Sequence, residues 1–362
     1  MQTESELKLA IQNALSQVIY PNFEKDIVSF GFVTKMDLNN NVCYLKITIP
    51  SSNTQVIEKV REDILEKTKN LPLANIDIEI VTPNIQKEQT MQAPKNLAPT
   101  IKHFVMVSSG KGGVGKSTTS VNLAISLAKS GKKVGLLDAD IYGPNIPRML
   151  GLGGIEPKTT QDGKKLLPLE KYGIKTMSIE SIYGKGQSFI WRGPIVMRVI
   201  AQLLQDVEWG ELDIMVVDMP PGTGDAQLTL AQSVPVGAGI NVTTPQMVAL
   251  DDGFRALDMF AKCNIPIFGI IENMSGFVCP DCNKTYDIFG KGNSQMLANE
   301  FKTQVVAQIP LEPSIVSASD SGKPISFYEP DSKTSKIYMQ CAARLIDFLQ
   351  TYKADNSKIQ PQ

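Results

Sequence analysis

The chain has 362 residues, enough for two domains of ordinary size, and 42% of them are hydrophobic, as in globular proteins with a sizeable core. Its 36 basic and 37 acidic residues nearly cancel, so bulk charge favours neither nucleic acid nor an acidic membrane as a partner. No apolar run reaches the ~18 residues of a membrane span, and the acidic N-terminus lacks the pattern of a signal or transit peptide. Five cysteines do not suggest a disulfide framework, so we expect a reduced, cytoplasmic protein.

Residues 1–82 predict a small α+β domain. Apolar residues recur at helical spacing in two segments of this unit. Stretches rich in strand-favouring residues lie on either side of an asparagine-rich turn at 39–41. The expected helices cover about 7–18 and 56–68, and the expected strands 27–33, 42–49 and 76–81. Residues 83–99, rich in Pro, Gln and Lys, predict a linker.

Residues 100–352 alternate between continuous apolar strands and amphipathic helices. This pattern predicts an α/β fold, a parallel sheet with helices on both faces. The expected strands are 103–108, 133–138, 174–179, 213–218, 237–243, 265–271 and 304–309, and the clearest helices are 194–207, 246–262 and 334–351. Residues 353–362 form a polar tail.

A phosphate-binding loop follows the first of these strands. The stretch 110–118 contains the pattern G-x-x-x-x-G-K-[ST] between an apolar strand and a helix, as a P-loop requires. In such a loop the backbone N–H groups cradle the phosphates, the lysine neutralises their charge, and the hydroxyl binds Mg²⁺. The expected nucleotide-binding residues are Gly110, Lys111, Gly112, Gly113, Val114, Gly115, Lys116, Ser117 and Thr118.

Carboxylates follow two further strands. Asp138 and Asp140 end one strand and Asp218 ends another, at the edge of the sheet where ligands of α/β proteins bind. Asp218, after four apolar residues, has the form of a Walker-B aspartate, so Ser117 and Asp218 are the expected Mg²⁺ residues. The loop after Asp218 has the glycines of a switch segment. GTP would call for an Asn-Lys-x-Asp element, which is absent, so ATP is the expected nucleotide.

These motifs together resemble a known family. Lys111 gives the loop the form of the deviant Walker A motif of the MinD/ParA/NifH class of dimeric ATPases. Further stretches, at 137–147, 191–194, 218–225, 272–275 and 279–282, resemble the Mrp/ApbC family of iron–sulfur cluster carrier ATPases. Residues 1–82 resemble the small N-terminal domain of many Mrp proteins. Such relatives often carry a cysteine after the strand ending near 50, where this chain has Ser51, Ser52 and Asn53.

The resemblance implies roles for individual residues. Lys111, Lys116 and Asp140 would be catalytic: Lys111 would reach across a dimer interface to the partner's nucleotide, and Asp140 would orient the attacking water. Asn273 would contact adenine. The implied switch residues are Asp138, Asp140, Gly222 and Asp225.

Cys279 and Cys282 form a Cys-x-x-Cys pair, which can hold one metal from a tight turn. A tetrahedral site needs four soft ligands, and the sequence offers no second pair, which indicates a site shared by two chains. A shared iron–sulfur cluster, structural zinc and a redox or unliganded dithiol all remain open. Cys43, Cys263 and Cys341 follow apolar patterns and are expected in the core.

The resulting hypothesis is a homodimeric ATPase that uses ATP and Mg²⁺, carries a cluster between its two chains, and passes it to apoproteins. A bridging [4Fe-4S] cluster is the expected form, and apo iron–sulfur proteins and an assembly scaffold are the expected partners, with no nucleic acid or membrane. The alternatives are a ParA/MinD-type positioning ATPase and a zinc-stabilised nucleotide-binding scaffold.

Overall fold

The computed structural model describes residues 4–21, 25–39, 41–49, 54–81, 96–183 and 193–351. Contacts divide the chain into two compact units, residues 1–92 and 93–362. Most of the predicted linker and the whole predicted tail lie outside the described residues, as do 51–53 and 184–192.

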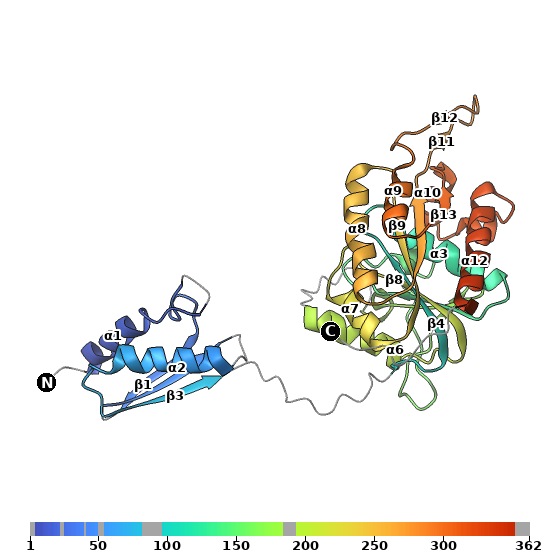
Figure 1. Cartoon of the computed structure of the whole chain (residues 1–362). Coiled ribbons are helices and arrows are strands. Elements are labelled where there is room, and N and C mark those ends of the chain that lie inside the picture. Colours follow the sequence, from blue (N-terminus) through green and yellow to red (C-terminus); the bar gives the residue numbers. More distant parts are fainter. Residues whose placement is uncertain are drawn as a thin grey trace. The chain divides into compact units, whose positions relative to one another are not determined.

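The first unit is a three-stranded sheet with two helices (Figure 1). Its helices are α1 (Glu4–Leu15) and α2 (Thr54–Thr68), and its strands are β1 (Val33–Asn39), β2 (Val42–Thr48) and β3 (Asn75–Val81). β2 pairs with β1 antiparallel and with β3 parallel. Alternate residues of β2, including Cys43 and Leu45, are buried in one cluster with Ile11 of α1 and Ile64 of α2. This alternation holds the helices on one face of the sheet.

The strand predicted at 27–33 is wrong. The Asp26 carboxylate accepts hydrogen bonds from the backbone N–H groups of Val28 (2.9 Å) and Ser29 (2.8 Å), which closes a turn. Gly31 then takes a left-handed backbone conformation (φ 72°), and β1 begins only at Val33. The apolar residues of this stretch pack as a loop, with Phe30 and Phe32 stacked 5.0 Å apart.

The second unit contains an eight-stranded sheet in the order β13-β10-β9-β4-β8-β5-β7-β6. The pairs are parallel except for the edge strand β6, which the sequence did not reveal because it is only three residues long. The seven predicted strands are confirmed, with ends that differ by one or two residues. They are β4 (Ile101–Ser108), β5 (Val134–Asp138), β7 (Ile174–Ser178), β8 (Leu212–Asp218), β9 (Val236–Thr243), β10 (Ile267–Asn273) and β13 (Val305–Ile309), beside β6 (Leu169–Lys171).

Helices cover both faces of this sheet, which confirms the predicted α/β class (Figure 1). One face packs against α6 (Gly193–Gln205), α7 (Asp225–Ser233), α8 (Met247–Lys262) and α9 (Asn293–Glu300), and the other against α3 (Lys116–Lys129), α4 (Ile146–Met149) and α12 (Lys333–Thr351). Successive residues of β4 alternate between the faces: Phe104 and Met106 join the first cluster, and Val105 and Val107 the second.

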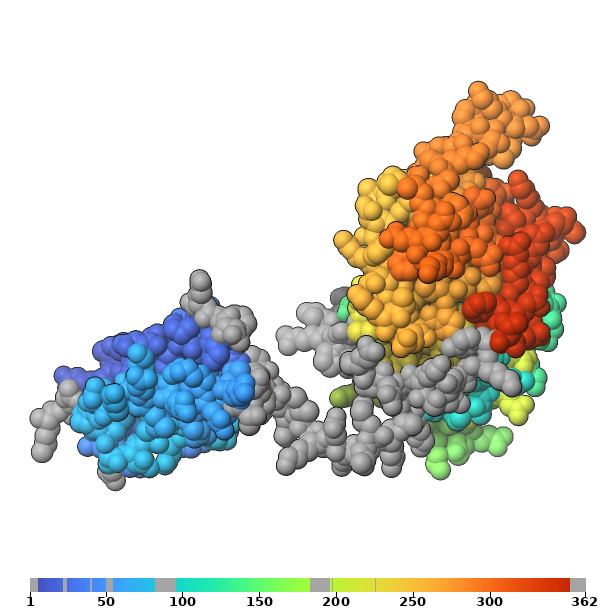
Figure 2. All heavy atoms as spheres, in the orientation of Figure 1, coloured from blue at the N-terminus to red at the C-terminus, as the bar shows by residue number. Residues whose placement is uncertain are grey.

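Short helices complete the unit: α5 (Ile179–Tyr183), α10 (Pro313–Asp320) and α11 (Ile325–Tyr328). A small hairpin, β11 (Phe277–Val278) paired with β12 (Thr285–Tyr286), follows the carboxyl end of β10 and projects away from the sheet (Figures 1 and 2). Among the described helices, none is both long and apolar enough to cross a bilayer.

Candidate functional site

The P-loop joins the central strand β4 to α3, at the carboxyl edge of the sheet. Gly113 (φ 80°) and Gly115 (φ 85°) take the left-handed conformation that curls the loop. A Cβ atom at Gly110 would collide with the backbone of Asp252 on α8, so only glycine fits there. The curl of the loop is therefore set by its own backbone geometry and by its close contact with α8.

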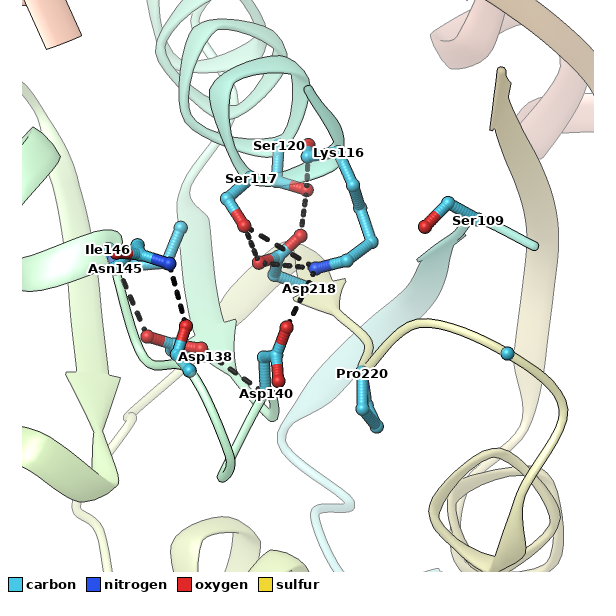
Figure 3. A network of polar contacts seen from close by, with 12 residues as sticks. Ser109, Lys116, Ser117, Ser120, Asp138, Asp140, Asn145, Ile146, Asp218 and Pro220 are labelled. Atoms are coloured by element: carbon cyan, nitrogen blue, oxygen red, sulfur yellow. Dashed lines mark hydrogen bonds and ion pairs between the residues drawn. The ribbon is translucent and has the colours of Figure 1, made fainter. Parts of the chain in front are cut away.

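Lys116 lies at the centre of a buried network of charged and hydroxyl groups (Figure 3). Its Nζ is 2.8 Å from Asp218 Oδ2 and 3.6 Å from Asp140 Oδ2. Ser117 Oγ donates to Asp218 Oδ2 (2.6 Å), and Ser120 Oγ donates to Asp218 Oδ1 (2.7 Å). The side chains of Lys116 and Asp218 are 7% and 1% exposed. The structure thus brings the predicted P-loop lysine close to the predicted Mg²⁺ residues, Ser117 and Asp218, and to Asp140, the predicted water-orienting residue.

Asp138 faces away from Lys116 and braces the following loop (Figure 3). Its carboxyl oxygens accept hydrogen bonds from Ser178 Oγ (3.0 Å) and from the N–H groups of Asp140 (3.2 Å) and Ile146 (3.3 Å). Complete burial, followed by repulsion from Asp218, raises the pKa of Asp138 to about 8. Burial also raises the pKa of Asp140, and the charge of Lys116 opposes that shift. Asp138 therefore holds Asp140 in place through the loop backbone.

The loop after Asp218 is tied to the P-loop strand and to α7. The Gly222 N–H donates to the Ser109 carbonyl (2.8 Å), and Gly222 itself has φ 90°. Gln227 is buried, and its Nε2 donates to the carbonyls of Pro220 and Gly222, each at 2.9 Å. α7 begins at Asp225, directly after this loop. A switch role for Gly222 and Asp225 stays a prediction.

Two other predicted residues lie on the rim of the P-loop. Asn273, the last residue of β10, donates from Nδ2 to the Val114 carbonyl (2.9 Å). Lys111 Nζ donates to Gln246 Oε1 (3.4 Å), just before α8. The predicted adenine contact of Asn273 and the cross-dimer reach of Lys111 stay predictions.

Cys279 and Cys282 lie at the tip of the β11–β12 hairpin. The N–H of Cys279 donates to the Lys284 carbonyl, and that of Asn283 to the Cys279 carbonyl, which closes a tight turn. The backbone N–H of Cys282 and then that of Asp281 lower the pKa of the Cys279 thiol. Such N–H groups stabilise a thiolate, the form that binds metal. Among the described residues, no third His, Cys, Asp or Glu joins the pair in a metal-binding group.

Comparisons with known proteins agree with this arrangement. Residues 100–346 match the family model described as NUBPL iron-transfer P-loop NTPase, and residues 8–80 match that of an iron–sulfur cluster assembly protein. The chain is 52% identical to an iron–sulfur cluster carrier protein of Helicobacter pylori over 97% of this chain and 96% of that protein. It is 37% identical to one of Escherichia coli K12, covering 94% and 91%. The chain belongs to the iron–sulfur cluster carrier family of P-loop NTPases.

Solved structures support the fold of this family member. A nucleotide-binding protein of Archaeoglobus fulgidus in complex with ADP is 36% identical, with a TM-score of 0.55 over 64% of this chain and 90% of that one. The cell division ATPase MinD of Pyrococcus furiosus, 20% identical with a TM-score of 0.51 over 68% of this chain and 99% of that one, shares the fold alone. The resemblance to cluster carriers and the enzyme class, a P-loop ATPase, are thus confirmed.

The structure adds residues that the motifs did not single out. Ser120 follows Ser117 by one helical turn on α3, a spacing that could have revealed it. Gln227 and Gln246 gave no signal in the sequence, because each acts through a contact with a distant segment. Cys43 and Cys341 are buried as predicted, while Cys263 is half-buried at the end of α8. Trp191 and Arg192 lie outside the described residues.

Proposed function

We propose that this protein is a cytoplasmic, homodimeric ATPase that binds an iron–sulfur cluster between two copies of the chain and transfers it to apoproteins. One observation carries the proposal: a single folded unit holds a complete P-loop site and a two-cysteine turn that has no third ligand among the described residues. Two thiolates leave a tetrahedral S₄ site half filled, and a second copy would supply the other half. We propose [4Fe-4S] as the cargo.

An exposed apolar surface beside the hairpin supports a dimer. The surface consists of Met247, Val248, Ile288 and Met296, which are 55%, 67%, 56% and 63% exposed. The start of α8 and the start of α9 adjoin, because Asn293 Nδ2 donates to the Pro245 carbonyl (2.7 Å). Exposed apolar side chains on adjoining segments are typical of an interaction site. A second copy that covers this surface would also approach Lys111, which adjoins α8 through Gln246.

The network around Lys116 indicates how ATP would be bound and cleaved. Lys116, whose Nζ lies 2.8 Å from Asp218 Oδ2, would neutralise charge on the phosphates held in the P-loop. Mg²⁺ would be held by Ser117 and, through water, by Asp218, and when bound it would neutralise charge on the phosphates. Asp140 would orient a water for attack on the γ-phosphorus as the bond to the β-phosphate oxygen breaks and ADP leaves. Lys111 of the partner subunit would stabilise the charge that develops.

Anaerobic reconstitution with iron and sulfide tests the cluster proposal. Iron, sulfide and zinc per chain are measured with the visible absorption spectrum, for wild type and for Cys279→Ala/Cys282→Ala, with Cys263→Ala as the matched control. About four irons and four sulfides per dimer, lost in the double variant and kept in the control, are expected. Zinc that iron cannot displace would refute the cluster and make the pair structural. A transfer assay to an apoprotein then tests delivery.

The dimer surface has its own test. Val248→Asp places a charge in the surface, and Val316→Asp places the same charge on α10, where Val316 is 58% exposed. Light scattering after size-exclusion chromatography should show that Val248→Asp weakens the dimer and reduces cluster loading, and that Val316→Asp changes neither. Equal behaviour of the two variants would contradict this interface.

A further inference from the structure

A short segment joins the P-loop to the cysteine hairpin. β10 ends at Asn273, and the chain then runs through Met274 and Ser275 into β11 and on to Cys279. We propose that residues 272–275, the coupling segment, transmit the state of the P-loop to the two cysteines, with Glu272 and Ser275 as positioning residues. This inference deepens the proposed function, on which it rests for its purpose, by giving a route within one chain from nucleotide to cluster ligands.

The nucleotide end of the coupling segment contacts the P-loop backbone directly. Asn273 Nδ2 donates to the carbonyl of Val114, which lies between the two left-handed glycines of the loop. The same amide packs so closely against Gly115 that an added Cβ there would collide with it. A change in the backbone at 114–115 on phosphate binding would therefore alter the position of Asn273.

At the hairpin end of the coupling segment, the buried side chain of Glu272 holds Ser275. Glu272 is 1% exposed, and its Oε1 accepts hydrogen bonds from Ser275 Oγ (2.5 Å) and Gln308 Nε2 (2.9 Å). Within the described part of the chain, its Oε2 is buried without a hydrogen-bond partner. Burying a carboxyl group with one oxygen atom unpartnered is costly, and an apolar residue would fill the space at lower cost. Such a group indicates a role beyond packing.

The backbone between the two ends is constrained. Met274 takes the left-handed conformation (φ 57°), which is uncommon for a residue with a Cβ atom. Such a conformation persists where the surrounding structure holds the backbone on both sides. The Ser275 N–H donates to the Ile309 carbonyl (2.8 Å), and the Leu311 N–H donates to the Gly276 carbonyl (2.9 Å). Because hydrogen bonds hold the backbone on both sides of Met274, a displacement of Asn273 should also displace Ser275.

Thiol labelling of the cluster-free, reduced protein tests the coupling. The alkylation rate of Cys279 and Cys282 is followed by peptide mass spectrometry, with and without saturating Mg²⁺ and a non-hydrolysable ATP analogue. In wild type the nucleotide should change this rate by about fivefold or more. Glu272→Leu, which removes the acceptor for Ser275 Oγ, and Ser275→Ala, which removes the donor, should abolish most of that change while the analogue's Kd stays within about twofold of wild type. Ser275→Thr, which keeps the hydroxyl, should restore it.

Ser317→Ala is the matched control, since Ser317 donates to the Pro313 carbonyl on the exposed α10. It should keep the wild-type nucleotide effect. If Glu272→Leu does not fold, Ser275→Ala and Ser275→Thr carry the test. The coupling is overturned if wild type shows no nucleotide effect, or if the folded variants keep the full effect. The assay uses no cluster, so failure of iron loading would defeat the proposed function and leave this result to stand by itself.

Discussion

Replacing Lys116 with methionine should destabilise the nucleotide-free protein far more than loss of a surface ion pair. Methionine keeps most of the side-chain volume and removes the charge that faces Asp218 (2.8 Å) and Asp140 (3.6 Å). Removing one partner of a buried pair costs about 3–5 kcal/mol, because the other charge stays buried and unpaired. Asp218 keeps two hydroxyl donors, Ser117 and Ser120, so we expect the low end of this range.

Lys102→Met is the control for this prediction. Lys102 is paired with Asp213 at 2.8 Å in the same unit, but its side chain is 68% exposed. Exposed pairs contribute about 0–1 kcal/mol. Urea unfolding followed by tryptophan fluorescence measures both losses, because both tryptophans of the chain, Trp191 and Trp209, belong to this unit.

A double-mutant cycle then measures the coupling energy between Lys116 and Asp218. Asp218→Asn in the Lys116→Met background should recover part of the lost free energy of unfolding, because the unpaired carboxylate is gone. The reasoning is refuted if Lys116→Met costs no more than Lys102→Met, or if the cycle gives a coupling energy near zero.

Three further predictions concern single side chains. Because burial raises the pKa of Asp138 to about 8, the folded state holds a proton there that the unfolded state releases near 3.8. Stability should therefore fall as the pH rises from about 4 toward 8 and level off above it, and Asp138→Asn should flatten this fall in urea unfolding at stepped pH. Gly110→Ala should lower stability by about 1–3 kcal/mol through its collision with Asp252, whereas Gly112→Ala, with open space around its Cβ, should leave the Tm of the nucleotide-free protein unchanged. Gln227→Leu should remove two hydrogen bonds of about 1 kcal/mol each and speed hydrogen exchange in 219–224 by about tenfold or more, while Gln295→Leu on the exposed face of α9 should not.

The sequence was sufficient for the seven parallel strands of the second unit because each of them is an apolar run between helices of clear periodicity, and in this sheet it missed only the three-residue edge strand β6. It misplaced the first strand of the other unit because apolarity at 27–33 does not reveal the turn made by the Asp26 side chain. The β11–β12 hairpin was invisible as strands, since two residues a side show no alternation.

The candidate site was predictable in kind but not in detail. The motifs supplied Lys116, Ser117 and Asp218, because their spacing along the chain fixes where a P-loop and a strand end must meet. The resemblance gave Asp140 the water-orienting role, but the sequence could not show which way the side chains of Asp138 and Asp140 face, because strand alternation stops at Asp138 and the Ile141 N–H closes a turn onto the Ala139 carbonyl. Only the three-dimensional path shows that Asp140 faces Lys116 while Asp138 faces Ser178.

The topology of the sheet gives the proposed coupling between nucleotide and cysteines a short path. In a parallel sheet the carboxyl ends of the strands share one edge, so the loops after β4, β5 and β8 meet at Lys116. β10 is separated from β4 only by β9, and its last residue, Asn273, spans that strand to reach Val114. The hairpin extends from this same end of β10. A cysteine pair on any loop at the opposite edge would lack this contact, so we infer that its position after β10 is what allows the P-loop to act on it within a single chain.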